Sequence, residues 1–356
     1  MTAVYADANV GVPGVELAAL TDWMDTQGLE YGSLTEVRAI GGGTQNIMLR
    51  FTRGAREFVL RRGPLHPRAT TNDNLRREMR LLAALSDTAV PHAPLIAACL
   101  DESALGESVF YLMEPLDGFN AAVELPALHA TNEGVRYRMG LAVVDALATL
   151  STVDYEAAGL ADFGRPEGFL ERQVPRWLHE LDSYARLDNY PGHGLPVEFV
   201  SEWLTRNRPS SGPIGIMHGD YHLANVMFAP DGPQVAAIVD WEMCTIGDPM
   251  LDLGWLLATW PEPDERGDVL GSALAGAGGL PPAQELVRRY GERTGFDVSA
   301  ADWYAVLACF KLGIILEGTH ARSCAGLAPA DVGQRLHTSA TTLFARACNL
   351  INRNQS

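Results

Sequence analysis

The sequence predicts an α+β fold of two lobes, in which a small antiparallel-sheet lobe with one helix precedes a larger, mainly helical lobe. Three observations lead to this prediction. Residues 34–62 alternate apolar and polar positions in short runs, which is typical of antiparallel strands. Residues 72–87 repeat apolar side chains at helical spacing, and helix-forming residues dominate after Pro115. We therefore expect one lobe over residues 1–115 and the other over residues 116–356.

The small lobe takes its first strands from residues 34–62, where glycines and the turn "RGAR" separate the apolar runs. The helix that follows opens on Asn and Asp, which are suitable caps. Its apolar side chains lie three or four residues apart: Leu75, Met79, Leu82 and Leu85. Two further strands are predicted in residues 94–102 and 108–116, with "DESALGE" as the turn between them.

The second lobe is predicted to be built from long helices, at residues 133–152, 165–187, 282–294 and 301–322. Residues 262–281 are rich in Pro, Gly and charged side chains, and we expect a loop there. No internal repeat or low-complexity tract interrupts this pattern.

Composition excludes several classes of protein. The 356 residues are 47% hydrophobic and 20% charged, so the chain can bury a sizeable core. A formal net charge of -17 argues against a nucleic-acid surface and favours neutral or cationic small ligands. Five scattered cysteines without a CxxC spacing indicate reduced thiols. With no basic and apolar leader and no long apolar run, we expect a cytoplasmic protein without a membrane partner, and the oligomeric state stays open.

The glycine-rich stretch "GGGTQN" at residues 41–46 lies between two predicted strands. Glycines there would let backbone amides approach phosphates closely, although a simple hairpin turn would use the same residues. A Walker A loop is excluded because it needs a lysine, and the only lysine of the chain is Lys311.

A cation at the end of one predicted strand and an acid on the following helix can form an ion pair. Arg61 follows the apolar run "FVL", and Glu78 lies on the predicted helix. Such a pair would present the cation to the phosphates of a nucleotide. Most other arginines of residues 50–80 are expected on the solvated surface, so replacing Arg53 or Arg56 should be nearly neutral.

Two stretches, "HGDYHLAN" at residues 218–225 and "IVDWE", contain the polar set of a phosphoryl-transfer site. One carboxylate would orient the attacking hydroxyl, while an amide and a second carboxylate would hold magnesium against the nucleotide. Asp220, Asn225 and Asp240 supply these groups, with "AAIV" as a strand that delivers Asp240.

Two other interpretations of this stretch remain. A helix cap and two turn residues would account for the same polar residues. A zinc site could use His218 and His222, which are four residues apart, but Gly219 stands where a hydrolytic zinc motif needs its glutamate. In "GDPMLDLGWLL", we expect Asp252 to be a support residue that accepts backbone hydrogen bonds from the catalytic loop, with the apolar run forming a helix.

Taken in order, these motifs resemble the aminoglycoside phosphotransferase family, a branch of the protein-kinase-like fold. The series runs "GGGTQN", "FVLRR", "RREMRLLAAL", "VFYLMEPLDG", "HGDYHLAN", "IVDWE" and "GDPMLDLG" along nearly the whole chain. The resemblance is closest to the subgroup that includes the kinase-like domains fused to animal acyl-CoA dehydrogenases and many actinobacterial homologues. It therefore implies a two-lobed protein-kinase-like fold.

The resemblance also implies a role for each matching residue. Asp220 would be the catalytic carboxylate, Asn225 and Asp240 the magnesium ligands, and Arg61 would stand where most kinases have a lysine. The nucleotide would be held by Gly42, Gly43, Thr44, Asn46, Arg61, Glu78 and the linker backbone at Glu114 and Leu116. His218 and Asp252 would support the catalytic loop.

The function implied is an ATP- and Mg²⁺-dependent phosphotransferase that moves the γ-phosphate to a hydroxyl of a small molecule, such as an aminoglycoside-like, amino-alcohol or hydroxyacyl acceptor. The alternative is a nucleotide-binding pseudokinase that regulates a partner. Only eight positions separate Asp240 from Asp248, too few for the activation loop on which protein kinases bind peptides. We expect the acceptor pocket to form from the helices between Pro115 and His218 and from the C-terminal helices. Trp303, Tyr304, Phe310 and Glu317 could line an aromatic and acidic wall there, although a core helix is the more common interpretation for each residue.

Overall fold

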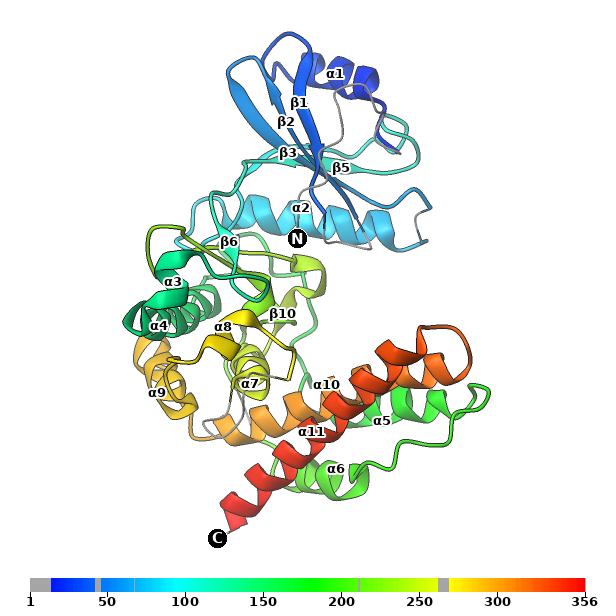
Figure 1. Cartoon of the computed structure of the whole chain (residues 1–356), viewed down its shortest axis with the longest axis vertical. Coiled ribbons are helices and arrows are strands. Elements are labelled where there is room, and N and C mark those ends of the chain that lie inside the picture. Colours follow the sequence, from blue (N-terminus) through cyan, green and yellow to red (C-terminus); the bar gives the residue numbers. More distant parts are fainter. Residues whose placement is uncertain (1–13, 42–45, 67, 211, 262–268, 356) are drawn as a thin grey trace. The chain divides into compact units, whose positions relative to one another are not determined.

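The computed structural model describes residues 14–41, 46–66, 68–210, 212–261 and 269–355. The chain divides into two compact units, which Figure 1 shows in colours that follow the sequence. Unit 1 comprises Met1–Gly118 together with Ala236–Glu242, and unit 2 comprises Phe119–Val235 together with Met243–Ser356. The division after Gly118 lies close to the predicted boundary at residue 115. The sequence did not indicate that the chain returns to unit 1 at residues 236–242.

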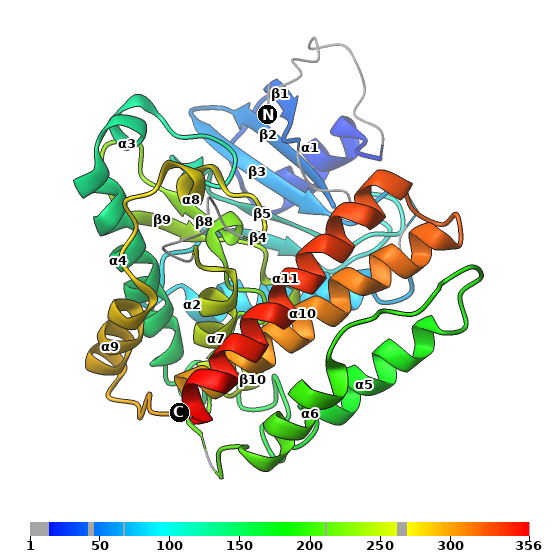
Figure 2. The same ribbon diagram turned by 60° about the horizontal axis from the view of Figure 1, so that its bottom comes forward.

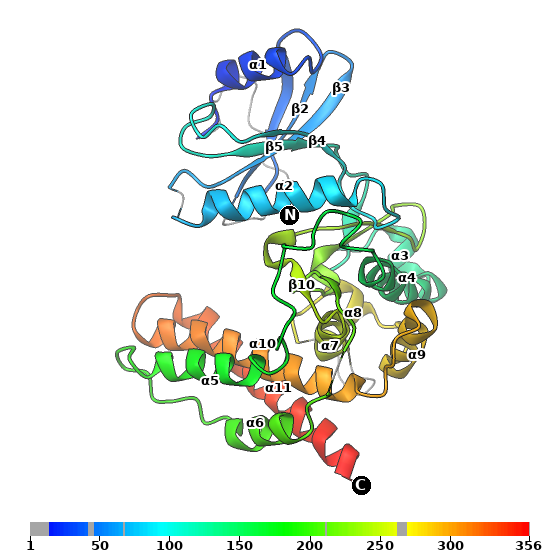
Figure 3. The same cartoon turned by 180° about the vertical axis from the view of Figure 1, so that it is seen from behind.

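Unit 1 is built on a five-stranded antiparallel sheet with the strand order β1-β2-β3-β5-β4. The strands are β1 (Leu34–Ala39), β2 (Ile47–Arg53), β3 (Arg56–Arg62), β4 (Leu95–Cys99) and β5 (Phe110–Met113). The helices are α1 (Leu17–Thr26) and α2 (Thr71–Leu85), which lie on opposite sides of the sheet (Figures 1 and 3). The predicted strands and the predicted helix are therefore confirmed.

Side chains of β3 alternate between the two faces of the sheet, as the strand period of two requires. Leu60 belongs to the core that α1 covers with Leu20 and Met24. The next residue, Arg61, therefore points to the other face, where it pairs with Glu78 of α2. Helix α1 was not predicted because its sequence offers few local signals, and the structure gives it no side-chain cap at Glu16.

Unit 2 contains most of the helices of the described chain. They are α3 (Ala127–Thr131), α4 (Glu133–Ser151), α5 (Gln173–Tyr184), α6 (Val197–Arg206), α7 (Met250–Thr259), α8 (Ala273–Ala277), α9 (Ala283–Thr294), α10 (Ala301–Cys324) and α11 (Ala330–Gln355). Short strands accompany them: β6 (Phe119–Asn120), β7 (Gly215–Met217), β8 (Val226–Phe228) and β10 (Thr245–Gly247). β6 pairs with β8 and β7 with β10, all antiparallel. β9 (Val235–Ile238) carries the chain from unit 2 into unit 1.

Helix α10 is the central helix of unit 2 and packs against α11, α7, α5 and α6. Figure 2 shows α10 and α11 side by side, with α5 and α6 along the same hairpin. By length and apolar composition α10 could cross a membrane, and 72% of its most apolar window is buried inside the protein.

All four residues of the possible wall on α10 are buried, so the core-helix interpretation holds for each of them. The indole of Trp303 donates to the backbone oxygen of Leu204 at 3.0 Å. The hydroxyl of Tyr304 donates to Asp248, and the ring of Phe310 packs edge-on against a phenylalanine of α11. These side chains hold α10 to its neighbours and are not available to line a pocket.

Three predicted helices are confirmed with nearly the expected bounds, as α4, α9 and α10. The helix predicted at residues 165–187 is shorter, because α5 covers only Gln173–Tyr184, and the predicted loop at 262–281 holds the short helix α8 in its described part. Helices α6 and α11 were not predicted. Helix α11 is rich in Thr and Ser, which favour helices weakly, and the burial of Leu343, Phe344 and Ile351 stabilises it.

Candidate functional site

The predicted site residues form two groups, one within each unit. The first is built around an ion pair between strand β3 and helix α2. The guanidinium of Arg61 donates to both carboxylate oxygens of Glu78, with Nε–Oε2 at 3.0 Å and Nη2–Oε1 at 2.7 Å. Tyr111, which pairs with Arg61 across the sheet, donates its hydroxyl to Glu78 Oε2 at 3.2 Å. The predicted ion pair is therefore present, and it is almost fully buried.

Asp240 joins this group from the segment that returns to unit 1. Its Oδ1 lies 3.7 Å from Nη2 of Arg61, and 44% of its side chain is exposed. The predicted strand before it is confirmed as β9, whose last residue, Ile238, donates its N–H to Pro91 O at 2.8 Å. Asp240 has a φ of 67°, a left-handed conformation that costs on the order of 1 kcal/mol. The backbone therefore holds this carboxylate in a strained position beside Arg61.

The charges of this group keep the arginine protonated. Burial alone would lower the pKa of the Arg61 guanidinium, but the negative charges of Glu78 and Asp240 raise it above its usual value. A cation whose charge and orientation are both fixed in this way suits the recognition of phosphate oxygens.

The linker residues lie at the end of β5. The N–H of Glu114 donates to Pro94 O at 2.9 Å, so any contact of its backbone with a ligand is left to its carbonyl. Its carboxylate accepts a hydrogen bond from Arg56, which is therefore paired as well as partly exposed. Gly42, Gly43 and Thr44 lie outside the described residues. Asn46 lines a small polar pocket that also includes Glu78 and Glu242.

The prediction that Arg53 lies on the solvated surface is wrong. Only 1% of its side chain is exposed. The guanidinium donates to the backbone oxygens of Gly32 at 3.0 Å and Leu29 at 3.2 Å, and it pairs with Asp25 of α1. Because replacing Arg53 leaves these backbone oxygens without their donor and opens space in the core, the change should destabilise unit 1 and is not neutral.

The second group lies in unit 2, on the loop that follows β7. Asp252 of α7 accepts the backbone N–H groups of His218 at 2.6 Å and Gly219 at 2.8 Å, so the predicted support contact is confirmed. Gly219 has a φ of 86°, and a Cβ there would lie 2.5 Å from the backbone oxygen of Met243. Asp252 and the glycine together determine the path of the loop.

Asp220 and Asn225 are brought together by this loop. Asn225 Nδ2 donates to the backbone oxygen of Asp220 at 2.9 Å and to its carboxylate Oδ2 at 3.0 Å. The other carboxylate oxygen, Oδ1, lies 3.4 Å from His222 Nε2. Leu223–Asn225 form a turn of 3₁₀ helix that closes the loop before β8. The catalytic candidate is therefore held by two neighbours on the same short loop.

The zinc interpretation of His218 and His222 is not supported, because residues 218–222 form a loop and not the helix that the motif needs. His218 is fully buried, and its Nδ1 accepts the N–H of Asp220 at 3.3 Å. His218 therefore contacts the backbone of the loop at Asp220, and its role as a support residue stays a prediction.

The carboxyl group of Asp220 on the loop and that of Asp252 on α7 have opposite pKa shifts. Burial acts to raise the pKa of Asp220, but the hydrogen bond and charge of His222, with the charges of His218 and Lys311, lower it to about 2. Burial raises the pKa of Asp252 to about 7, although the N–H groups of Gly219 and His218 oppose this rise. Asp220 is thus ionised near neutral pH.

Lys311 of α10 is a residue of this group that the sequence reasoning missed. Its Nζ lies 3.4 Å from Gly219 O, 4.4 Å from the ring centroid of Trp255 and 5.5 Å from that of Trp177. Burial lowers its pKa, and the charges of Asp252 and Asp220 oppose that effect. The available signal was a single lysine in a chain whose other basic residues are arginines, placed within the apolar run "ACFKLGII".

The comparisons with known proteins agree with this geometry. Residues 36–298 match the sequence model of the phosphotransferase enzyme family, APH. The chain is 30% identical to mouse acyl-CoA dehydrogenase family member 11 over 294 residues, which is 80% of this chain and 36% of that protein. It is 28% identical to mouse family member 10 over 283 residues, or 79% of this chain and 26% of the relative. The chain spans only about a quarter to two fifths of the curated relatives that it matches.

Solved structures show the same fold. A candidate aminoglycoside phosphotransferase from Ralstonia eutropha is 28% identical, with a TM-score of 0.76 over 94% of this chain and 99% of that chain. The aminoglycoside phosphotransferase APH(4)-Ia, in complex with ADP and hygromycin B, is 12% identical, with a TM-score of 0.58 over 92% and 98%. A Plasmodium vivax ethanolamine kinase is 13% identical, with a TM-score of 0.52 over 88% and 83%. The last two support the kinase-like phosphotransferase fold alone.

Proposed function

The chain belongs to the phosphotransferase enzyme family, and we propose that this small-molecule phosphotransferase moves the γ-phosphate of ATP, with Mg²⁺, to a hydroxyl of a small neutral or cationic acceptor. The observation that carries the proposal is the loop of unit 2, where Asn225 donates to the carboxylate of Asp220 and Asp252 accepts the backbone N–H groups of His218 and Gly219.

Asp220 would act on the acceptor. Its carboxylate can accept a hydrogen bond from the attacking hydroxyl and orient the oxygen for in-line attack. A carboxylate with a pKa of about 2 is a weak base, so it would take the proton late, when the bond to phosphorus has largely formed. This timing suits the loose transition state of phosphoryl transfer.

Arg61 would act on the nucleotide. Glu78 holds its guanidinium by two hydrogen bonds, which presents a fixed positive charge to phosphate oxygens without the flexibility of a lysine. Glu78 would thus be a positioning residue, and its partner Tyr111 limits its movement further.

Each unit offers an oxygen atom of the kind that Mg²⁺ prefers. Asp240 would provide its carboxylate in unit 1, and Asn225 would provide its amide oxygen in unit 2. The Nδ2 atom of Asn225 is already engaged by Asp220, so its oxygen is the atom left for a cation. Mg²⁺ would bind the nucleotide phosphates and neutralise their charge.

The interval after Asp240 favours a small acceptor. Residues 241–247 contain a turn of 3₁₀ helix (Trp241–Met243) and strand β10, and Asp248 follows at once. No segment there is long enough to form a platform for a peptide. The acidic net charge would attract a cationic acceptor by long-range steering.

The test is acceptor-dependent release of ADP from Mg·ATP, measured with aminoglycosides, amino alcohols, hydroxyacyl compounds and a generic protein substrate. We expect at least one small alcohol to stimulate release and to carry the phosphate, and we expect none on the protein. A chain that binds ATP in a thermal-shift assay but releases no ADP with any acceptor would instead be a pseudokinase. Efficient labelling of the protein substrate would contradict the proposed acceptor class.

A further inference from the structure

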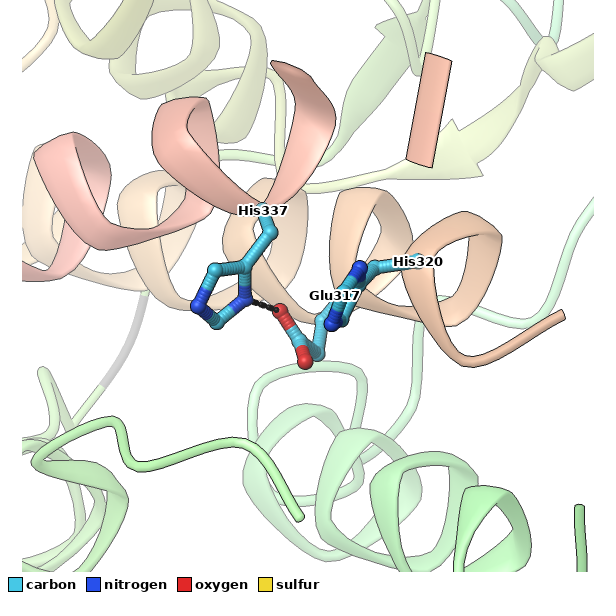
Figure 4. Close-up of side chains that lie close together, drawn as sticks. All are labelled: Glu317, His320 and His337. Carbon is cyan, nitrogen blue, oxygen red and sulfur yellow. Dashed lines mark hydrogen bonds and ion pairs between the residues drawn. The ribbon is translucent and has the colours of Figure 1, made fainter. Parts of the chain in front are cut away.

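A second cluster of polar side chains lies in the hairpin of α10 and α11. Glu317 and His320 come from α10 and His337 comes from α11. Each residue offers one possible ligand atom, and the three atoms lie within 4.8 Å of one another. Figure 4 shows the three side chains pointing toward one another from the two helices. None of the three belongs to the loop that carries Asp220.

Glu317 is the buried member of the cluster, with none of its surface exposed. Its Oε1 accepts the hydroxyl of Tyr190 at 2.8 Å, and its Oε2 lies 2.7 Å from Nδ1 of His337. Among the described residues its only ion-pair partner within 4.0 Å is His337. A fully buried carboxylate is costly unless a positive charge lies against it. A cation beside this carboxylate, whether a protonated His337 or a metal ion, would offset the cost of burying its charge.

His320 has unused capacity as a ligand. Its Nδ1 atom is buried and has no hydrogen-bond partner in the described part of the chain. Its ring lies beside that of His337, with centroids 4.5 Å apart and planes tilted by 32°. Two imidazoles packed against one buried carboxylate repel each other if both are protonated, whereas both can bind a metal as neutral rings.

We propose that Glu317, His320 and His337 bind one Zn²⁺ ion. Two nitrogen ligands and one carboxylate are a donor set that zinc accepts, with a fourth position open to water. The spacing Glu317-x-x-His320 places two ligands on one face of α10. Bonds of roughly 2.0–2.2 Å bring tetrahedral ligands to about 3.4 Å apart, so small side-chain rotations from the present separations are sufficient.

The surroundings match those of a metal site. Tyr190 holds the carboxylate oxygen that does not face His337, which is the outer contact that commonly orients a metal-binding carboxylate. Because Glu317 and His337 are 20 residues apart, the ion would link α10 to α11 and, through Tyr190, to the segment after α5. Its expected effect is therefore on the stability of this hairpin, and the proposal does not depend on phosphotransfer.

The experiment uses the full chain, stripped of metal with a chelator and then titrated with zinc chloride or with cobalt chloride as a spectroscopic probe. We expect one ion per chain, a higher midpoint of thermal unfolding, and the absorption spectrum of four-coordinate Co²⁺. Glu317→Gln and His337→Asn should each lose the spectrum, although the asparagine can still donate to Glu317. The matched control is His179→Asn, on the exposed side of α5, which should bind as the unmodified chain does.

Two results would overturn the proposal. One is absence of stoichiometric Zn²⁺ and of the Co²⁺ spectrum in the unmodified chain. The other is unchanged binding in folded Glu317→Gln and His337→Asn, since the ion would then lie elsewhere. If those variants do not fold, Tyr190→Phe tests the same site more gently: it should weaken binding by about tenfold or more. An unchanged affinity in that variant would also count against the site.

Discussion

The two groups of site residues fix their acids in different ways. In unit 1, Glu78 is held by the side chain of Arg61, and both residues come from regular elements, a strand and a helix. In unit 2, Asp252 is held by two backbone N–H groups, and Asp220 lies on a loop. Positive charge is fixed in the first group, whereas the second contains the carboxylates of Asp220 and Asp252, with Lys311 near both of them.

This difference separates the two halves of the proposed chemistry. A guanidinium fixed by an acid is suited to bind an anion such as a phosphate chain. An ionised carboxylate on an anchored loop is suited to orient a hydroxyl and later accept its proton. Substitutions in unit 1 should therefore change nucleotide binding and local stability, while those in unit 2 should change turnover.

Asp220→Asn should produce the largest effect on turnover. We expect kcat to fall by at least about a hundredfold, with nucleotide affinity nearly unchanged, because the variant keeps the shape and the contact with Asn225 but loses the base. Steady-state kinetics and nucleotide titration measure the two quantities. Asp231→Asn, an exposed acid in a turn of the same unit, is the matched control. If nucleotide affinity and kcat fell by the same factor, Asp220 would contribute to nucleotide binding and not specifically to the transfer step.

The buried ion pair of unit 1 can be compared with a more exposed Arg–Glu pair of the same geometry. Arg50 and Glu57, on β2 and β3, have the same two distances, 3.0 and 2.7 Å, as Arg61 and Glu78. The side chains of the first pair are 31% and 38% exposed, and those of the second are 13% and 3% exposed.

Double-mutant cycles to alanine, measured by denaturant unfolding, should give a coupling energy of about 1–3 kcal/mol for Arg61 and Glu78. The exposed pair should give less than about 1 kcal/mol. Equal coupling in the two pairs would show that burial does not distinguish them, and Arg61 would then have no special claim to a nucleotide role.

The pH dependence of the free energy of unfolding can show whether the buried carboxyl group of Asp248 destabilises the protein near neutral pH. Burial raises its pKa to about 6, against hydrogen bonds from Tyr304 at 2.5 Å and from the N–H of Met250 at 3.0 Å. Its folded pKa lies above the ordinary aspartate value of 3.8, so its contribution to stability is greatest below about pH 4 and is lost as the pH rises through about 6.

Across that interval, the free energy of unfolding should decrease by about 1–3 kcal/mol on account of Asp248, and Asp248→Asn should flatten this part of the profile. Chemical denaturation at a series of pH values measures it. Asp302→Asn, an exposed acid in the first turn of α10, should leave the profile as it is. A profile of unchanged slope in Asp248→Asn would assign the dependence to other groups.

Lys311→Met should have the smallest of these effects. Methionine fills similar space beside Trp255 and Trp177 but removes the charge near Asp220 and Asp252. We expect kcat to fall by about tenfold, with little change in nucleotide affinity. Arg176→Met removes a cation that also lies over the ring of Trp177, from an exposed position, and should be nearly neutral. If both variants behave alike, Lys311 only fills space.

Much of unit 1 and of the catalytic loop could be predicted because the signals are local. The period of two in residues 34–62 specifies strands, and the three-and-four spacing of residues 72–87 specifies a helix, whatever the rest of the chain does. The pairing of Arg61 with Glu78 and the support from Asp252 followed from motif order, and both contacts are present.

Other features depend on residues that meet only after folding. The sequence marks Arg53 as one arginine among many, and only the approach of α1 and the segment after it buries its guanidinium. Helix α11 has weak local propensity and is stabilised by the apolar surface of α10. From the sequence, Trp303, Tyr304 and Phe310 could belong to a pocket wall or to a core helix, and only the helices packed around α10 decide for the core.

By itself, then, the sequence determined the first strands and helix of unit 1, several helices of unit 2 and the chemical types of the proposed site, since side-chain spacing and residue type are local properties. The tertiary structure alone decided which charges are buried and which distant residues meet, such as Lys311 beside Gly219 or His337 beside Glu317. The physical reason is that the cost of a buried charge depends on every group packed around it, and those groups come from segments far apart in the chain.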